Sequence, residues 1–201
     1  MNDDDDDQRL RFEQMALQHL DAGYNLARWL TRNEHDAQDV VQEAWLRAMR
    51  YHRAFRGDQF RPWWLTIVRH TCYSWIRTNR PAELVAQADA DEATRGGMAP
   101  ESDEPQEAAM RNADRAQINT AIAALPVCYR EVLVLRELED LSYRDIARIA
   151  DLPIGTVMSR LSRARGLLRD ALSAALSDNP RGDARPALKA VPAPVRRGAV
   201  Q

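Results

Sequence analysis

The sequence has few of the features that membrane-bound or secreted proteins need. None of its apolar runs approaches the roughly 18 residues of a membrane-spanning helix. Its N-terminus, MNDDDDDQRL, lacks the basic and apolar segments of a secretory signal. We therefore expect a cytoplasmic protein without a membrane span.

Cysteine and histidine are too few and too scattered to predict a disulfide or a metal centre. The two cysteines, Cys72 and Cys128, stand in unrelated contexts, as reduced and partly buried thiols do. The four histidines form no pair at ligand spacing. A phosphate-binding glycine loop and a nucleophile–base motif are also missing. We expect no metal, no cofactor and no catalytic residue, and hence a protein that is not an enzyme.

The net charge of −2 hides a strong segregation of charge along the chain. Counting Lys and Arg against Asp and Glu, residues 1–50 carry −5, 51–80 carry +5, 81–114 carry −7, 115–176 carry +2 and 177–201 carry +3. Basic blocks beside acidic ones favour a polyanion such as nucleic acid as partner, although solvated helix surfaces also carry charge.

Composition divides the chain into two helical segments and three others. Residues 9–80 and 113–176 are rich in helix-forming residues with few breakers. Residues 81–112 contain Ala, Gly, Pro and acids, as a flexible acidic linker does. Residues 1–8 and the proline-rich 177–201 read as disordered tails. The sequence thus predicts an all-α protein with two small helical domains joined by a flexible linker.

The segment HDAQDVVQEAWLRAMRY predicts a helix with an acidic surface. Asp36 is a candidate N-cap. The surface opposite the apolar side carries Asp39, Gln42, Glu43 and Leu46. A leucine among polar residues is either part of a docking surface or a scattered apolar residue, and periodicity alone does not decide between them.

Arginines alternate with aromatic residues in the segment that follows. The loop and the helix start at Pro62 contain Arg53, Phe55, Arg56, Phe60, Arg61 and Trp63, and the polar side of the helix adds Arg69, His70, Tyr73 and Arg77. Bases stack on aromatic rings while guanidinium groups neutralise phosphates, so the pattern suits single-stranded nucleic acid. The alternative is that the aromatics, above all Trp64 and Trp75, form core.

The segment LSYRDIARIADLPIGTVMSRLSRAR predicts two short helices separated by a break at DLPIG. Ser142 is the expected N-cap of the first helix, with Asp145 at its third position. On the second helix the apolar residues Val157, Leu161, Ala164 and Leu168 lie within one narrow arc. The opposite arc and its flanks carry small, polar and basic side chains: Thr156, Ser159, Arg160, Ser162, Arg163 and Arg165.

Residues 156–169 contain four arginines and no acid. An ordinary surface helix would mix Glu with Arg to form i,i+4 pairs. The pattern fits a helix-turn-helix whose second helix enters the major groove, where arginines pair with guanine or with phosphates. A merely solvated basic surface is the alternative.

The segment LPVCYREVLVLRELEDLSYRDIARIADLPIGTVMSRLSRAR resembles the C-terminal DNA-binding domain of the bacterial extracytoplasmic-function sigma factors. The segments YNLARWLTRNEHDAQDVVQEAWLRAMRY and FRPWWLTIVRHTCYSWIRTNR resemble their N-terminal domain. Both matches stand in the family's order around a variable linker. The resemblance implies a sigma-2-like bundle at 9–80 and a sigma-4-like helix-turn-helix domain at 113–176.

By this resemblance the chain is a transcription initiation factor, of a family used in stress responses, that binds core RNA polymerase and directs it to promoters. Residues Asp36, Asp39, Gln42, Glu43 and Leu46 would bind the clamp coiled coil of the largest polymerase subunit. The melted minus-ten element would contact Arg53, Phe55, Arg56, Phe60, Arg61, Trp63, Arg69, His70, Tyr73 and Arg77. The minus-thirty-five element would contact Arg144, Thr156, Ser159, Arg160, Ser162, Arg163 and Arg165. Further partners implied are the polymerase flap and an anti-sigma protein.

Two residues depart from the family pattern. The family often has Asn where this chain has His70, and Asp where it has Ser74. A competing hypothesis is a stand-alone helix-turn-helix regulator that binds an operator as a dimer. Such a regulator would need a ligand or receiver domain, and residues 9–80 lack the strands of a receiver. Only a sigma factor should copurify with core polymerase.

Overall fold

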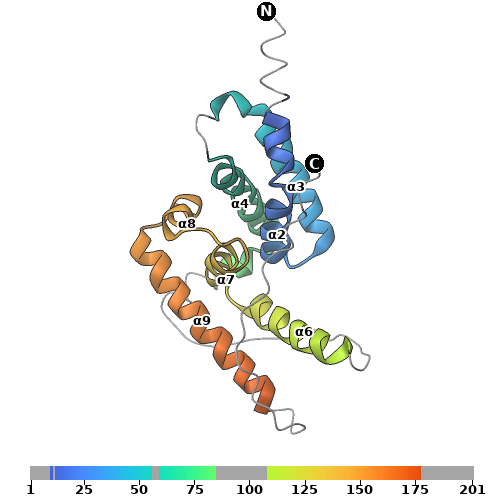
Figure 1. The fold of residues 1–201 in the computed structure, drawn as a ribbon, viewed down its shortest axis with the longest axis vertical. Helices are drawn as coiled ribbons and strands as arrows, with labels where there is room; N and C mark the ends of the chain where they lie inside the picture. Colours follow the sequence, from blue (N-terminus) through green and yellow to red (C-terminus); the bar gives the residue numbers. More distant parts are fainter. Residues whose placement is uncertain (1–9, 11, 56–58, 85–107, 178–201) are drawn as a thin grey trace, which may run out of the picture.

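The computed structural model describes residues 10, 12–55, 59–84 and 108–177, and all regular structure among them is helical (Figure 1). An N-terminal unit contains α2 (Leu20–Thr31), α3 (Glu34–Arg50), the 3-10 helix η1 (His52–Ala54) and α4 (Phe60–Asn79). A C-terminal unit contains α6 (Ala108–Ala124), α7 (Val127–Leu133), the π-helical turn η2 (Val134–Leu138), α8 (Tyr143–Ala150) and α9 (Ile154–Ser177). The predicted all-α class is confirmed.

The described helices extend into the predicted linker from both sides. Residues 81–84 are helical, and α6 begins at Ala108, five residues before the predicted start of the second domain. The Ala-rich sequence AAMRNADRAQ explains the earlier start, since Ala has the highest helix propensity. The rest of the predicted linker (85–107) and residues 1–8 and 178–201 of the predicted tails lie outside the described residues.

In the N-terminal unit, α2, α3 and α4 pack around the indole of Trp64. This side chain is fully buried, and its Nε1 donates a hydrogen bond to the His19 carbonyl at 3.0 Å. A glycine stands where α2 crosses the indole, because a Cβ on Gly23 would lie 2.4 Å from Trp64 Nε1. Trp75 is partly buried, with the Arg80 guanidinium 5.2 Å from its ring centroid. The core alternative for Trp64 is therefore confirmed.

One of the two predicted helix caps is correct. Ser142 caps α8, with its Oγ accepting from the Asp145 amide at 3.1 Å. The cap predicted at Asp36 is wrong, because α3 begins at Glu34 and its N-cap is Asn33, whose Oδ1 accepts from the Asp36 amide at 3.0 Å. Asn and Asp cap helices about equally well. Capping at Asn33 makes α3 about one turn longer than capping at Asp36 would.

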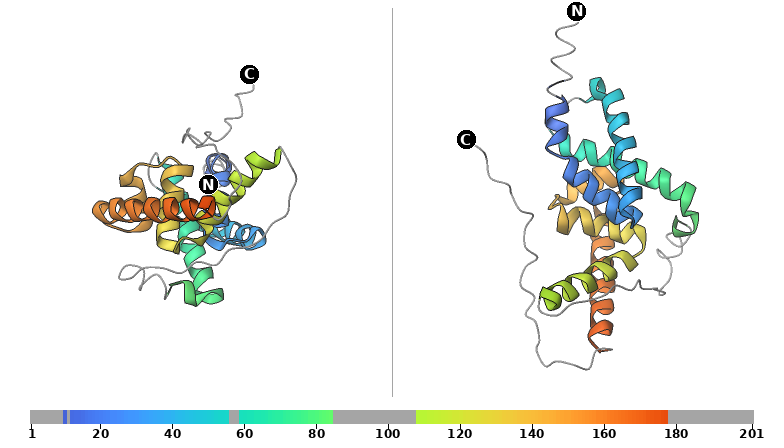
Figure 2. Two further views of the ribbon diagram at one scale, coloured as in Figure 1. Left: turned by 90° about the horizontal axis from the view of Figure 1, so that it is seen from below. Right: turned by 90° about the vertical axis from the view of Figure 1, so that its right-hand side faces the viewer.

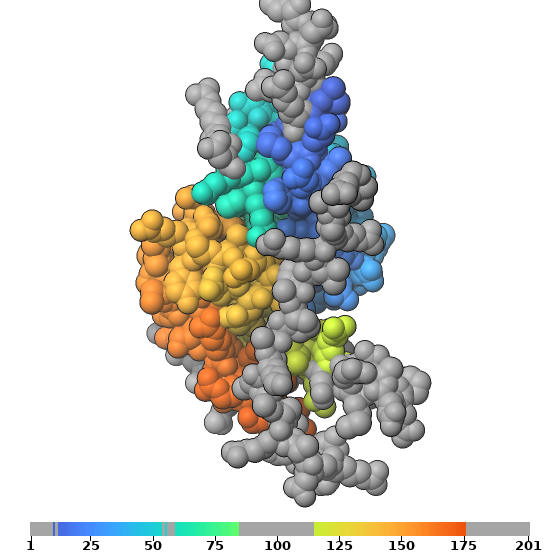
Figure 3. Space-filling view, in the orientation of Figure 1, coloured from blue at the N-terminus to red at the C-terminus, as the bar shows by residue number. Residues whose placement is uncertain are grey.

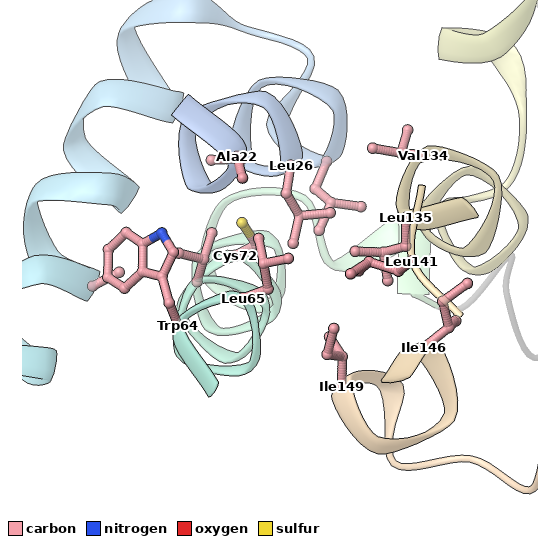
Figure 4. Close-up of a cluster of buried hydrophobic side chains, with 14 of the residues drawn as sticks. Ala22, Leu26, Trp64, Leu65, Cys72, Val134, Leu135, Leu141, Ile146 and Ile149 are labelled. Atoms are coloured by element: carbon pink, nitrogen blue, oxygen red, sulfur yellow. The ribbon is translucent and has the colours of Figure 1, made fainter. Parts of the chain in front are cut away.

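The two units pack directly against each other, as the ribbon views and the space-filling view both show (Figures 2 and 3). Helix α4 lies against α8, and α2 lies against α7. Their buried side chains form one continuous apolar core across the boundary (Figure 4), which includes Leu26, Leu65, Val134, Leu135, Leu141, Ile146 and Ile149. The prediction of two tethered domains did not include this shared core.

A second, smaller core lies inside the C-terminal unit. It joins α6, α7 and α9 through residues that include Ile122, Leu125, Leu133 and Ala164. None of the described helices combines the length and the apolar character that a bilayer crossing needs. Within the described ranges, no cluster of His, Cys, Asp or Glu has the arrangement of a metal site.

Candidate polymerase and promoter interfaces

The structure gathers the five predicted polymerase-binding residues on the outer surface of α3. Asp39, Gln42, Glu43 and Leu46 are exposed and Asp36 is half-buried. Leu46 exposes 56% of its surface although it stands among polar side chains. The acids also make ion pairs on the surface, from Glu43 to Arg47 at 2.8 Å and from Asp36 to Arg80 at 3.8 Å. The surface is therefore acidic and polar around one exposed apolar side chain.

The second helix of the helix-turn-helix, α9, is amphipathic as predicted. Val157, Leu161 and Ala164 are buried against the rest of the C-terminal unit. The opposite arc faces outward, where Ser159, Ser162, Arg163 and Arg165 are exposed and Thr156 and Arg160 are half-buried. Arg144 of α8 is exposed as well. The described structure thus presents a basic ridge with small side chains between its arginines.

Two of these arginines contact other parts of the C-terminal unit. Arg165 pairs with Glu137 of η2, with Nη2 and Oε1 2.5 Å apart, and this hydrogen bond raises the pKa of Arg165. Arg163 Nη1 donates to the hydroxyl of Tyr129 at 3.4 Å. Arg165 therefore leans toward η2, while Arg163 stands closer to the centre of the outer arc.

Two exposed apolar residues at the start of α9 are not among the predicted contact residues. Ile154 and Met158 expose 43% and 54% of their surface. They lie one helical turn apart, on the flank that also carries Arg165. Apolar side chains can contact the methyl group of thymine in the major groove. Their position outside the buried apolar arc can be seen in the sequence and would have indicated that they are exposed.

The loop aromatics form a cluster with Phe12, which is not among the predicted contact residues. Phe12 lies edge-on to Phe60 and Trp63, with ring centroids 5.2 and 5.6 Å apart, and Phe55 lies 5.3 Å from Trp63. Phe60 is buried, whereas Phe55 and Trp63 are half-buried. Arg53 beside the cluster is exposed, and Arg56 lies outside the described residues.

Helix α4 divides the predicted minus-ten residues into two groups. His70 and Arg77 are exposed to solvent. Arg61, Arg69 and Tyr73 instead contact acids of the C-terminal unit. Three of the predicted strand-binding side chains are therefore engaged inside the protein.

The contacts of this second group converge on two carboxylates. Arg61 Nη2 lies 2.5 Å from Glu139 Oε2, and Asn25 Nδ2 donates to the other oxygen at 3.3 Å. Arg69 pairs with Glu131, which also accepts a hydrogen bond from the Tyr73 hydroxyl at 2.9 Å. The exposed fractions of Glu131 and Glu139 are 0% and 4%. Both acids are thus buried where the units meet.

Glu131 shifts the pKa values of three groups near it, Arg69, Cys72 and Tyr73. Burial is the largest single effect and opposes the charge of Arg69, but the contributions of Glu131 and Tyr73 together exceed it and raise the pKa of Arg69. Burial and then Glu131 raise the pKa of Tyr73 well above its usual value, and they raise the pKa of the Cys72 thiol in the same order. The raised pKa values favour a charged Arg69 guanidinium and a neutral Tyr73 phenol at neutral pH.

A further buried cation lies where α7 approaches the end of the N-terminal unit. Arg130 is 1% exposed, and its Nη1 donates to the Ala123 carbonyl at 2.7 Å. Glu83 lies 3.4 Å from its Nη2. Burial, followed by the charge of Arg32, lowers the pKa of Arg130 to about 10. This contact adds another charged pair between the two units.

Two family models match this chain. The model of sigma-70 region 2 matches residues 15–81, and that of sigma-70 region 4 matches residues 115–168. These ranges include the α3 surface, α4, the members of the aromatic cluster other than Phe12, and the helix-turn-helix with most of α9. The two regions follow one another in the same order as the two helical units.

Characterised relatives and solved structures agree with these matches. The RNA polymerase sigma-H factor of Pseudomonas aeruginosa is 34% identical over 171 residues, which cover 83% of this chain and 89% of the relative. The ECF RNA polymerase sigma-E factor of Escherichia coli K12 is 37% identical over 134 residues, or 65% of this chain and 70% of the relative.

Among solved structures, the sigma factor RpoE in complex with the anti-sigma factor NepR from Bartonella quintana aligns with a TM-score of 0.62 and 27% identity, over 81% of this chain and 97% of that one. CnrH in complex with the cytosolic domain of CnrY aligns with a TM-score of 0.57 and 25% identity, over 81% and 88%. The chain belongs to the extracytoplasmic-function group of the sigma-70 family, whose members are transcription initiation factors that direct RNA polymerase to promoters.

Proposed function

We propose that this sigma factor works through three separate surfaces and has no catalytic activity of its own. One surface binds core RNA polymerase, one holds the opened strand of the minus-ten element, and one contacts the minus-thirty-five duplex. The protein acts in the cytoplasm, and on the nucleoid while it is bound to polymerase.

The polymerase-binding surface is the acidic side of α3, formed by Asp36, Asp39, Gln42, Glu43 and Leu46. Its partner is the clamp coiled coil of the largest subunit, and the C-terminal unit binds the flap. An exposed leucine ringed by polar and charged side chains has the composition of a protein contact, since an apolar centre with a polar rim is typical of interfaces.

The minus-ten surface combines the aromatic cluster with the cations of α4 and of the segment before it. Phe55 and Trp63 are only half-buried, and stacking a base on an aromatic ring contributes about 1–3 kcal/mol. Extruding a base from the duplex costs a few kcal/mol, which stacking offsets. Arg53, Arg56, Arg61, Arg69 and Arg77 supply positive charge for the strand, and His70 and Tyr73 supply hydrogen-bonding groups.

The minus-thirty-five surface is the outer arc of α9, and it carries the proposal as a whole. Its acid-free ridge leaves Ser159, Ser162 and Arg163 exposed, so the helix can approach base edges closely. Thr156, Arg160, Arg165 and Arg144 flank this ridge and contact phosphates. Ile154 and Met158 add apolar contacts to thymine methyl groups.

The test is run-off transcription with core polymerase and a library of promoter sequences. We expect the purified chain to bind the core enzyme and to start transcripts at a family of sites that share two sequence elements. A stand-alone regulator would bind duplex DNA without copurifying with the core enzyme. Absence of both copurification and specific starts would reject the proposal.

We also propose an anti-sigma protein as a regulatory partner. The solved sigma factor from Bartonella quintana is bound to the anti-sigma factor NepR, and CnrH is bound to the cytosolic domain of CnrY. A purified candidate anti-sigma protein should form a complex with this chain and suppress its run-off transcription.

A further inference from the structure

Two buried carboxylates of the C-terminal unit bind cations and a phenol of the N-terminal unit. Glu131 of α7 contacts Arg69 and Tyr73, and Glu139, just after η2, contacts Arg61. We name these five residues the interunit contact. Each partner comes from a different unit, so these bonds exist only while the units are packed together.

The apolar surroundings make the interunit contact specific for one arrangement of the two units. Leu65, one helical turn from both Arg61 and Arg69 on α4, and Leu135 of η2 are fully buried in the shared core (Figure 4). A carboxylate in such a place is costly unless a cation and hydrogen bonds compensate it. Glu131 and Glu139 therefore stabilise only the arrangement in which Arg69 and Arg61 face them.

The same cations belong to the surface that we assign to the opened DNA strand. Carboxylates and phosphates are both oxyanions, and both use the same N–H donors of a guanidinium group. A phosphate cannot contact Arg69 or Arg61 fully while an acid of the protein occupies it. The outer arc of α9 is different, because Ser159, Ser162 and Arg163 stay exposed in the packed arrangement.

We infer that the packed arrangement is a self-inhibited state, in which Glu131 and Glu139 occupy the groups that would hold the minus-ten strand. This inference rests on the proposed strand-binding role of Arg61, Arg69 and Tyr73. In this state the protein still binds duplex through α9 but binds single strands weakly. Separation of the two units, driven by polymerase and by the opened strand, releases the α4 surface.

The chain between the units is long enough for them to separate. Residues 85–107 are 23 residues, which reach roughly 80 Å at full extension. Buried ion pairs contribute little net free energy, so the interunit contact does not by itself make the packing irreversible. If the packed state holds nine tenths of the molecules, the apparent affinity for a strand falls about tenfold.

The first test holds the units together. Gln59 and Arg148 are exposed side chains from opposite units, and Arg148 Nη1 donates to Gln59 Oε1 at 2.9 Å. Neither residue belongs to a proposed binding surface, and the native Cys72 and Cys128 are buried. In the variant Gln59→Cys/Arg148→Cys, a bis-methanethiosulfonate reagent should join the two new thiols, and dithiothreitol should release them.

Binding is measured with fluorescent DNA pools of random sequence, one single-stranded and one duplex. The crosslinked chain should bind the single strands at least tenfold more weakly than the reduced chain, while both bind duplex equally. The single variants Gln59→Cys and Arg148→Cys, treated with the same reagent, should show no difference between the two forms.

The second test releases the interunit contact by charge. The variant Glu131→Gln/Glu139→Gln keeps side-chain shape but removes both carboxylates. We expect about tenfold tighter binding of single strands and unchanged duplex binding. The control Glu137→Gln/Asp140→Asn removes the same charge from the same segment without touching the α4 cations, and it should leave single-strand binding nearly unchanged.

The outcomes separate this inference from the function on which it rests. Equal single-strand binding by the crosslinked and reduced chains overturns the inference and leaves the proposed function intact. If the reduced chain and the Glu131→Gln/Glu139→Gln variant both bind duplex but fail to bind single strands, the proposed strand-binding role fails, and the inference fails with it.

Discussion

Arg69 of α4 and Glu131 of α7 form an ion pair across the boundary between the two helical units, although they stand 62 positions apart in the chain. The Arg69 side chain is 15% exposed and that of Glu131 is fully buried. Tyr73 completes the site, because its hydroxyl donates to the second oxygen of the same carboxylate and its ring lies 4.6 Å from the Arg69 guanidinium carbon.

Removing Arg69 should therefore destabilise the protein strongly. Arg69→Ala leaves Glu131 without its cation, and breaking one side of a buried pair costs about 3–5 kcal/mol as long as the units stay packed. If the units separate, the loss is limited to the free energy of their packing. Urea unfolding measures the loss. The control is Arg77→Ala on the same helix, an exposed site where we expect a change within about 0.5 kcal/mol. Equal losses in the two variants would argue against a buried pair.

High pH should weaken the packing of the units through Tyr73. The pKa of Tyr73 is raised by burial and then by Glu131, so the folded protein favours the neutral phenol. The resulting stability is fully present below the usual tyrosine pKa of about 10 and is lost as pH rises toward the raised value. Between about pH 9 and pH 11, Tyr73→Phe should lose less unfolding free energy than the parent chain. If the unfolding free energies of both proteins fell equally with pH, Tyr73 would not be the cause of the loss.

Substitution of two glycines by alanine should change the stability of the protein in opposite directions. Gly23→Ala would place its Cβ 2.4 Å from Trp64 Nε1, so the indole or α2 must shift, at a cost of about 1–3 kcal/mol. At Gly166 of α9 an added Cβ would meet no atom within 4 Å, and Gly166→Ala should raise stability by up to about 1 kcal/mol through helix propensity. Thermal or urea unfolding distinguishes the two. A neutral Gly23→Ala would mean that the packing around Trp64 yields easily.

A single apolar side chain on α3 should carry much of the binding to core polymerase. Leu46→Ser removes an exposed leucine from the acidic surface, and the loss of a central apolar contact corresponds to tenfold weaker binding or more, about 1.4 kcal/mol. The control Leu17→Ser changes another exposed leucine, 59% accessible, in the segment before α2. Fluorescence anisotropy with labelled core enzyme measures both. Similar affinities would exclude Leu46 from the contact.

The outer arc of α9 should distinguish promoter sequences through Arg163. If this arginine reads a base, Arg163→Ala should weaken binding of the preferred minus-thirty-five duplex by roughly 1–3 kcal/mol and relax its sequence preference. The control is Arg115→Ala, which removes the same charge from an exposed site on α6, outside the proposed DNA-binding surface. Titrations at several salt concentrations provide the readout. An unchanged preference with a smaller salt dependence would make Arg163 a phosphate contact instead.

Local features of this fold were predictable from the sequence. The spacing of Val157, Leu161 and Ala164 placed them on the buried arc of α9, because a helix repeats its surface every 3.6 residues. Ser142 was recognised as a cap from equally local information, since it bonds to an amide three residues away. The incorrect cap at Asp36 marks the limit of such reasoning, because Asn33 and Asp36 are nearly equal candidates.

The partners of Arg69, Tyr73 and Arg61 were decided only by the tertiary structure. Their acids stand 58 to 78 positions away, and no periodicity relates residues so far apart. The sequence by itself determined which side chains are basic, aromatic or acidic and on which helix face each lies. Whether a basic face meets solvent, nucleic acid or a carboxylate of the same chain depends on how the helices pack, since burial of the shared apolar core brings those acids to α4.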